Sequence, residues 1–391
     1  MTDKELQEYV VKMRRHFHKY PELGLKEEKT SARIQKELKE FGYNVKRFQK
    51  CPTGIIAEIH GRKPGNKIVA LRADMDALPI QEESGESFSS KNAGVMHACG
   101  HDAHVAMLLG AARLLAEAAD DFGGTVRLLF EPAEEFAGAG KQMLAEGALD
   151  GVETAFAIHV QEGIPTGKIR VQEGICMAGA GFFSLTVKGK GGHGSAPDCG
   201  IDVIPAASAI VMNLQTIISR EISPLDSAVV SVGTFHAGTK ANIIADEAQL
   251  TGSLRYYSKK IQEQLPVAVR RVVESTAAAY RVQTDLICQC GLPPVINDAN
   301  CSRLATECAV ALMGHKCLYE GNPSTGSDDF AYYLEKVPGV YAFLGVGNES
   351  EEERSPAHSS GFKIDESMLY FGARMYTEYA LRYLKGRNSD E

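Results

Sequence analysis

Residues 97–119 decide the fold class, because they join a polar cluster to an apolar helix. The cluster reads His97-Ala-Cys99-Gly-His101-Asp102-Ala-His104, and it holds three imidazoles, one thiol and one carboxylate. The run that follows, Val105–Ala119, is apolar at helical spacing and predicts a buried helix. Short apolar stretches typical of strands lie on both sides of it, at 68–73, 125–130 and 154–159. Strands that alternate with helices predict an α/β layer with a largely parallel sheet.

The pattern changes near Gly181, and a chain of 391 residues is too long for one compact core. The segment that begins there predicts strands at 182–188, 228–235, 248–256 and 282–290 and helices at 203–220 and 258–280. This strand–helix–strand–strand–helix–strand order is typical of a ferredoxin-like α+β unit. The sequence therefore predicts a catalytic domain made of 1–180 and 294–391, with a mixed, mostly parallel sheet flanked by helices. An inserted ferredoxin-like domain is expected at 181–293.

Composition and charge exclude several classes of partner. The net charge of −8 is spread along the chain, so no basic face is expected to hold a nucleic acid. No apolar run approaches the roughly 20 residues that a membrane-spanning helix needs, and the charged N-terminus lacks the apolar core of a signal peptide. The nine cysteines form no disulfide framework and fit reduced thiols. We therefore expect a cytoplasmic protein with neither a nucleic acid nor a membrane as partner.

Residues able to bind metal ions stand mostly where the expected strands end. They are Cys99, His101, Asp102, Glu134, Glu135, His159 and His358. One ion would need three or four of these ligands, so the surplus suggests two ions about 3.5–4 Å apart that bind the attacking water and polarise a carbonyl. The adjacent carboxylates Glu134 and Glu135 suit such a site, because one can bind metal while the other moves protons. Ligands from widely separated segments favour a catalytic site over a structural one.

Motifs of other hydrolase mechanisms are missing from the sequence, which lacks His-Glu-x-x-His, Gly-x-Ser-x-Gly and the phosphate-binding loop. A metal-dependent hydrolase is therefore the leading hypothesis. His97 and His104, which flank the ligand cluster, are expected to support it rather than to bind metal. For Asp328 and Asp329, a helix cap and a supporting role at the metal remain equally open.

A further set of motifs spans nearly the whole chain. It comprises Arg14–Leu23, Arg72–Pro79, Met96–His104, Pro132–Glu135, Gly189–Pro197, Lys240–Ile244, Gly252–Arg255 and Gly326–Phe330. With these residues in this order, the sequence resembles the aminoacylase and hippurate hydrolase branch of the co-catalytic metallopeptidase family, which includes the plant auxin-conjugate amidohydrolases. Cys99 in the string His-Ala-Cys-Gly-His marks the amidohydrolase branch.

The resemblance implies a role for each residue of the site. The metal ligands would be Cys99, His101, Glu135, His159 and His358. They would hold two divalent ions per subunit, of manganese, zinc, cobalt or nickel. Glu134 would act as general base and later as general acid, and Asp76 would orient a ligand imidazole. In the inserted domain, His193 would help to hold the oxyanion, and Asn242 and Arg255 would lie near the substrate carboxylate.

The resemblance also implies the reaction, which is hydrolysis of the amide bond of N-acyl amino acids with an acetyl, benzoyl or similar acyl group. A dipeptidase or an aminobenzoyl-glutamate hydrolase is the alternative among enzymes. A catalytically silent protein that binds metal or a small molecule is the alternative of another class, and the presence of Glu134 disfavours it. The expected partners are a small N-acyl amino acid and a second copy of the chain, bound through the inserted lid or dimerisation domain.

Overall fold

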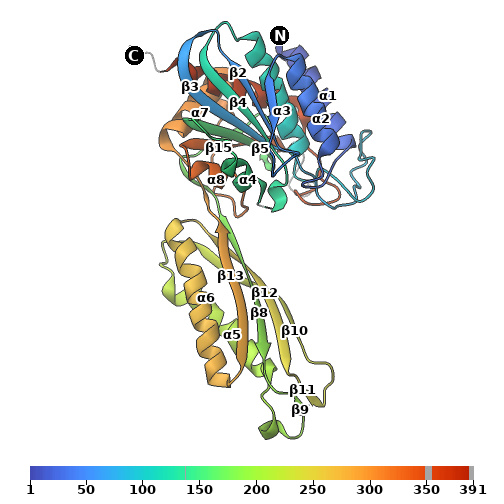
Figure 1. Ribbon diagram of the computed structural model, residues 1–391, viewed down its shortest axis with the longest axis vertical. Coiled ribbons are helices and arrows are strands. Elements are labelled where there is room, and N and C mark those ends of the chain that lie inside the picture. The colour runs from blue at the N-terminus through green and yellow to red at the C-terminus, as the bar shows by residue number, and fades with distance from the viewer. Residues whose placement is uncertain (137, 348–354, 387–391) are drawn as a thin grey trace. The chain divides into compact units, whose positions relative to one another are not determined.

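The computed structural model describes residues 1–136, 138–347 and 355–386, and the chain divides into two units. Unit 1 comprises Met1–Cys176, Ile296–Asn322 and Asp329–Glu391, and unit 2 comprises Met177–Val295 and Pro323–Asp328 (Figure 1). Unit 2 thus extends slightly beyond the expected 181–293 and takes in 323–328, which the sequence assigned to the other domain. Backbone pairing is the reason, since the N–H of Ala178 donates to the carbonyl of Ser324 at 3.0 Å.

A mixed sheet forms the centre of unit 1. Within the described residues its strands lie in the order β1 (Asn44–Arg47), β2 (Ile55–His60), β4 (Gly123–Glu131), β3 (Lys63–Asp74), β5 (Thr154–Pro165), β15 (Gly339–Gly347) and β6 (Ile169–Arg170). The central strands β4, β3, β5 and β15 run parallel, whereas β1, β2 and β6 pair antiparallel at the edges. The mostly parallel central sheet predicted from the sequence is confirmed. The sequence missed β1, because this short edge strand is largely polar and exposed and carries no alternating pattern.

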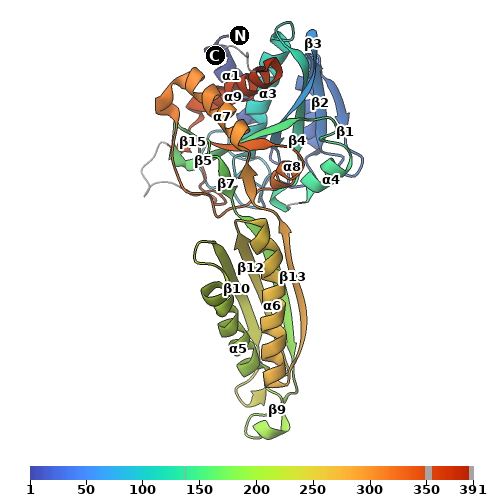
Figure 2. The ribbon, with the colours of Figure 1, turned by 90° about the vertical axis from the view of Figure 1, so that its left-hand side faces the viewer.

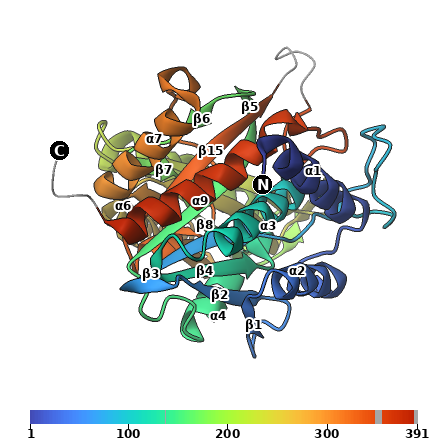
Figure 3. The same cartoon turned by 90° about the horizontal axis from the view of Figure 1, so that it is seen from above.

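Helices pack against this sheet. They are α1 (Asp3–Lys19), α2 (Glu28–Glu40), α3 (His101–Glu117), α4 (Ala139–Ala145), α7 (Ala299–Met313), α8 (Ala331–Leu334) and α9 (Leu369–Lys385). Figure 3 shows α3 beside both α1 and α9. A Cβ on Gly110 of α3 would lie 2.7 Å from Val10 and 3.0 Å from Ala373, so only glycine lets the three helices approach this closely. The apolar run predicted from the sequence is therefore the central, buried helix of unit 1.

Unit 2 is an antiparallel sheet with two helices on one face (Figure 2). Its elements are β8 (Gly179–Lys188), α5 (Val203–Thr216), β10 (Ala228–Ala237), β12 (Glu247–Tyr256), α6 (Lys259–Tyr280) and β13 (Gln283–Leu292). The strand order β10-β12-β8-β13 is that of a ferredoxin-like unit. Two short strands, β9 (Gly192–His193) and β11 (Ile243–Ile244), pair with each other beyond one end of the sheet, and β7 (Gly174–Met177) pairs with β14 (Val295–Asn297) where the chain passes between the units.

Helix α5 continues directly into the π-helical turn Ile217–Glu221. Residues 203–221 form a helix that is long and apolar enough, by composition alone, to cross a membrane, which the sequence analysis did not anticipate. Its residues Ala206, Ile210 and Leu214 are fully buried in the apolar core of unit 2. The helix thus has the buried face of a core helix.

Candidate metal centre

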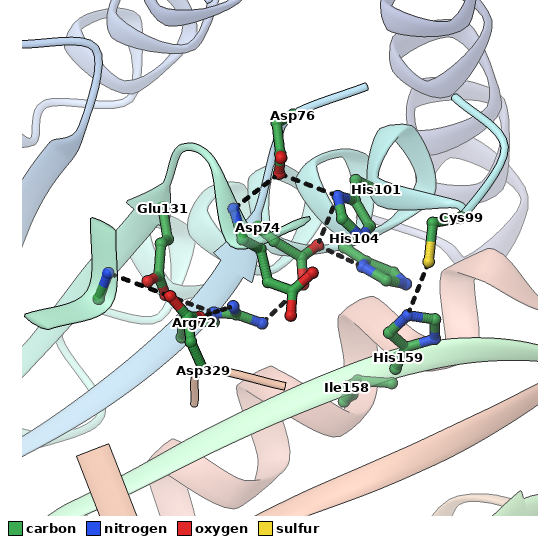
Figure 4. A network of polar contacts seen from close by, with 12 residues as sticks. Arg72, Asp74, Asp76, Cys99, His101, His104, Glu131, Ile158, His159 and Asp329 are labelled. Atoms are coloured by element: carbon green, nitrogen blue, oxygen red, sulfur yellow. Dashed lines mark hydrogen bonds and ion pairs between the residues drawn. The ribbon is translucent and has the colours of Figure 1, made fainter. Parts of the chain in front are cut away.

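Polar side chains gather at the edge of the sheet where the parallel strands of unit 1 end, and Figure 4 shows Asp74, Asp76 and His101 close together there. β3 ends at Asp74 and leads to Asp76, and β4 ends at Glu131 and leads to the 3-10 turn Glu134–Phe136. Helix α3 begins at His101, beside the same edge. Open α/β sheets usually bind their ligands at this edge, so the fold brings the predicted site together from distant segments.

Asp76 ties two of these loops together. Its Oδ1 accepts the backbone N–H of Glu134 at 3.1 Å, and its Oδ2 accepts that of Glu135 at 3.3 Å. Nδ1 of His101 lies 3.2 Å from Oδ1 of Asp76, a contact that fixes the ring and turns Nε2 away from this carboxylate. This Nε2 is buried and has no hydrogen-bond partner among the residues that the structure describes. A buried ring nitrogen oriented in this way is suited to bind a metal ion.

Three overlapping groups of side chains each bring their ligand atoms within 4.8 Å of one another. They are Cys99 with His101 and His159, Cys99 with Glu135 and His358, and His101 with Glu134 and Glu135. The five ligands that the resemblance implies, and Glu134, therefore lie in one cluster. His358 reaches it from the loop before α9, where its backbone is left-handed at φ 64°, and its Nε2 lies 3.2 Å from Oε1 of Glu135.

The donor set fits divalent transition metal ions. It combines imidazole nitrogens, a thiol and carboxylates, which are the ligands of zinc and its neighbours. Burial raises the pKa of the Cys99 thiol to about 12. Because a thiol with such a pKa stays protonated at neutral pH, Cys99 needs an adjacent cation to become a thiolate ligand.

His104 supports the cluster from behind. Its Nδ1 lies 2.5 Å from Oδ1 of Asp74, and its Nε2 accepts the backbone N–H of Val160 at 2.8 Å, so both ring nitrogens are occupied. Because Val160 follows His159, this contact holds β5 in place beside the ligand. His159 itself lies within β5 rather than at its end, since β5 continues beside β15. The supporting role that the sequence favoured for His104 stays a prediction, because His104 also lies in a group with Asp74 and His101 that could itself hold a metal ion.

Arg72 organises a group of buried carboxylates beneath the site (Figure 4). Its guanidinium donates to Glu131 at 2.8 Å, to Asp74 at 2.6 Å and to Asp329 at 3.0 Å, and all four side chains are almost fully buried. Burial alone would raise the pKa of Asp74, but His101, His104 and Arg72 hold it well below its usual range. Asp329 is thus tied to Asp74 and Glu131 through Arg72.

Asp102 belongs to a different network, although it adjoins His101 in the chain. Its Oδ2 accepts Nε of Arg14 at 2.8 Å and lies 2.8 Å from Nδ1 of His18. Nε2 of His18 lies 3.1 Å from Glu82. This candidate ligand from the sequence thus supports the start of α3 through a buried ion-pair network and is absent from the metal-ligand groups of the described residues.

The three residues of the expected substrate clamp lie in unit 2. His193 is exposed in β9, where Nδ1 lies 2.8 Å from the hydroxyl of Ser195, and it pairs with Ile243, the neighbour of Asn242. Arg255 lies near the carboxyl end of β12, opposite Ala180 of β8. The ten residues of β12 span roughly 30 Å at about 3.4 Å per residue. Unit 2 therefore brings His193 and Asn242 together but holds Arg255 at the other end of the sheet.

Comparison with known proteins identifies the family. Residues 70–382 match the model of the peptidase family M20/M25/M40. The chain belongs to this family. It is 40% identical over 385 residues to the N-acetylcysteine deacetylase of Bacillus subtilis, covering 98% of this chain and 99% of the relative. It is 41% identical over 389 residues to the IAA-amino acid hydrolase ILR1-like 2 of Arabidopsis thaliana, covering 98% of this chain and 87% of the relative.

A solved structure agrees with the sequence relatives. The crystal structure of a Bacillus subtilis protein described as a dinuclear metal binding peptidase of the M20 family matches with a TM-score of 0.85 at 37% identity. The match covers 98% of this chain and 99% of the other. The amidohydrolase branch that the sequence resembles is thereby confirmed, and this M20 protein is a metal-dependent amidohydrolase that acts on amide bonds.

Sequence reasoning missed Arg72 as a residue of the M20 site. A signal was present, because Arg72 is the lone charge within the apolar stretch 68–73. A charged side chain in the centre of a buried strand needs buried partners of opposite charge. These partners, Glu131 and Asp329, come from distant parts of the chain, and no local pattern identifies them.

Proposed function

We propose that this M20 enzyme hydrolyses the amide bond of N-acyl amino acids, such as N-acetyl or N-benzoyl amino acids, to a carboxylate and a free amino acid. The observation that carries the proposal is the side chain of Glu134, a carboxylate grouped with His101 and Glu135 within 4.8 Å. The relatives support the substrate class, since one is an N-acetylcysteine deacetylase and another an IAA-amino acid hydrolase.

The proposed cofactor is a pair of divalent ions of manganese, zinc, cobalt or nickel. The ligands would be Cys99, His101, Glu135, His159 and His358. When bound, the ions supply a Lewis acid that polarises the scissile carbonyl and lowers the pKa of the attacking water. The similarity to a dinuclear metal binding peptidase supports a pair rather than a single ion.

The protein's own groups move the proton in this proposal. Glu134 accepts the proton of the attacking water and returns it to the nitrogen of the leaving amino acid, which would otherwise leave as an unstable anion. Asp76 fixes the backbone of Glu134 and the ring of His101 at the same time, so base and ligand keep a constant separation. A base held in this way needs little reorganisation during the reaction.

The second unit would bind the substrate. In this proposal His193 donates to the developing oxyanion, and Arg255, with Asn242, pairs with the substrate carboxylate. His193 pairs with Ile243, which precedes β12, whereas Arg255 lies near the far end of that strand, whose length is roughly 30 Å at about 3.4 Å per residue. In this proposal a clamp that uses both residues therefore takes His193 from a second copy. We therefore also propose a homodimer through unit 2, whose edge strand β10 is largely exposed.

The proposed location is the cytoplasm. All nine cysteines lie within the described residues and are free thiols. Free thiols in this number suit a reducing compartment.

A substrate panel tests the proposed function. The metal-loaded enzyme is assayed with N-acetyl and N-benzoyl amino acids and with dipeptides. It is also assayed with the matching N-acyl amino acid amides, which keep the acyl group but lack the free carboxylate. We expect the N-acyl acids to have the highest kcat/KM. Arg255→Ala should lower kcat/KM for the acids by an amount that corresponds to about 2–5 kcal/mol of lost transition-state stabilisation, and it should change kcat/KM for the amides little. Preference for dipeptides would favour the dipeptidase alternative. Equal losses on acids and amides would show that Arg255 does not bind the carboxylate.

A further inference from the structure

Glu27 is a fully buried carboxylate that the proposed mechanism does not use. It stands at the start of α2 but makes no side-chain capping bond to that helix. Instead its Oε1 accepts the backbone N–H of Ala133 at 3.0 Å, across more than a hundred residues of sequence. Burial raises the pKa of Glu27 to about 7, which shows how unfavourable its position is for a charge. A buried carboxylate in such a place indicates a requirement beyond packing.

Ala133 begins the catalytic loop, by which we mean residues 133–136, the segment that carries the proposed base. It is buried and has a left-handed backbone at φ 53°, a conformation that a residue with a Cβ adopts only at a cost in free energy. It links the end of β4 to the turn Glu134–Phe136. Such strain persists only where surrounding contacts enforce it, and the bond from the Ala133 N–H to Glu27 is a contact of this kind.

Two buried carboxylates thus hold three consecutive backbone N–H groups. Glu27 accepts from Ala133, and Asp76 accepts from Glu134 and from Glu135. The direction of the backbone through Ala133 determines where the next two side chains lie. Losing the Glu27 contact therefore frees the chain at the residue immediately before the proposed base.

The segment that carries Glu27 also contacts the Asp76 loop. The carbonyl of Glu22 accepts the N–H of Ala77 at 2.9 Å, and a Cβ on Gly24 would lie 3.0 Å from the Cβ of Ala133. The Glu22 carboxylate accepts both the N–H and the hydroxyl of Thr30, at 2.9 and 3.0 Å, which anchors the segment to α2. Residues 22–27 therefore lie against both loops of the metal centre.

We propose that Glu27 is a positioning residue for amide hydrolysis, whose carboxylate enforces the left-handed turn at Ala133 and thereby aims Glu134 and Glu135. The inference rests on the proposed role of these two glutamates, and it does not depend on the identity of the acyl group. Supporting residues of metal centres typically contribute 10–100-fold to activity or metal affinity.

The test combines removal of the contact with relief of the strain. Glu27→Ala is expected to lower kcat by roughly 10–100-fold, while KM for the best substrate of the wild-type enzyme changes little. Glu27→Gln keeps an acceptor oxygen and should retain most of the activity. Ala133→Gly should recover several-fold of the lost kcat in the Glu27→Ala background, because glycine adopts the left-handed turn without a Cβ penalty.

Hydrogen exchange of the metal-free protein provides a readout that needs no substrate. The amides of residues 131–136 should exchange faster in Glu27→Ala than in the wild type, and Ala133→Gly should restore part of the protection. If Glu27→Ala does not fold, Glu27→Asp replaces it, because it keeps a carboxyl group but shortens the side chain by one methylene and so weakens the bond to the Ala133 N–H. If the enzyme cleaves other amides and not N-acyl amino acids, the proposed substrate class is overturned. The test of Glu27 then proceeds unchanged with the amide that the enzyme does cleave.

Glu37→Ala is the matched control. Glu37 lies on the same helix, is largely buried and accepts from Arg33 and Tyr9, away from the catalytic loops. It should leave kcat and the exchange of 131–136 unchanged. Three results would each overturn the proposal. They are an equal loss of kcat in the Glu37 and Glu27 variants, full activity in Glu27→Ala, and no recovery of kcat by Ala133→Gly.

Discussion

Glu134 and Glu135 are neighbours in the chain, but their side chains have different surroundings. Oε1 of Glu135 lies 3.2 Å from the ring of His358 and within the Cys99 ligand group. The carboxylate of Glu134 is grouped with His101 and lies outside the Cys99 groups, while its backbone is held by Asp76. The short 3-10 turn lets both side chains face the centre, which two adjacent residues of a strand would not do. One can therefore bind metal while the other moves protons.

This division predicts distinct effects for two isosteric variants. Glu134→Gln should lower kcat by about 10²–10⁴-fold, because the amide does not accept the proton of water, and it should leave the metal content unchanged. Glu135→Gln should instead lower the metal content, since a neutral amide is a weaker ligand. Activity and metal content of both proteins check this. Near-normal turnover of metal-replete Glu134→Gln would contradict the proposed base.

The Glu82 carboxylate makes a pH-dependent contribution to stability. Burial would raise its pKa, but bonds from His18, Ser84 and the N–H of Ser90 lower it to about 2. Its folded pKa thus lies below the unfolded value, so its stabilisation is fully present above about pH 4.5 and declines as the pH falls towards 2. Glu82→Gln should be less stable than the wild type at pH 7, and the gap should narrow below pH 4.5. Thermal unfolding of both metal-free proteins across this range measures the gap; a gap independent of pH would exclude the effect.

At the scale of elements, β3 carries the contacts that join the sheet to the site. Arg72 projects from this strand and binds carboxylates from β3, from β4 and from the segment before α8. Asp74 at the end of the strand then contacts His104 of α3, and His104 binds β5 through Val160. Strands and helix are therefore coupled by buried polar groups in addition to their apolar packing. This coupling keeps β5 and α3, which carry His159 and His101, in register.

Breaking this coupling should be costly. Arg72→Met leaves three buried carboxylates without their cation, and removing one partner of a buried ion pair typically costs about 3–5 kcal/mol. Arg62→Met is the matched control, because Arg62 pairs with Asp120 at the surface, with side chains 71% and 70% exposed. Exposed pairs contribute about 0–1 kcal/mol. Urea unfolding of the metal-free proteins compares them, and similar losses in both would contradict the role of Arg72.

At the scale of the whole molecule, the proposed dimer makes a testable prediction about shared sites. His193→Ala and Arg255→Ala should each be nearly inactive alone if the clamp uses both residues. After the two are mixed and allowed to exchange subunits, up to about a quarter of the wild-type activity should return, because half of the dimers are mixed and each has one intact site. Light scattering checks the dimer itself. No recovery in proven mixed dimers, or a strict monomer at micromolar concentration, would exclude a shared clamp.

The sequence alone predicted the family and the central sheet, and its motifs supplied the candidate metal ligands. These follow from local signals, since apolar runs mark buried strands and helices, and the motifs carry metal-binding side chains at their ends. The fold then brings strand ends to one edge for a general topological reason. Within the described residues, the five implied ligands and Glu134 lie in one cluster, as the motifs suggested.

Only the tertiary structure decided which charged groups are partners. His101 and Asp102 are adjacent in sequence, but successive residues of a helix point about 100° apart, so one reaches the metal centre and the other reaches Arg14. Arg72 meets Asp329, and Glu27 meets Ala133, across more than a hundred residues. Residues 323–328 join unit 2 through backbone pairing with Ala178. Such contacts depend on how distant segments pack against one another, and a local sequence pattern contains no information on that packing.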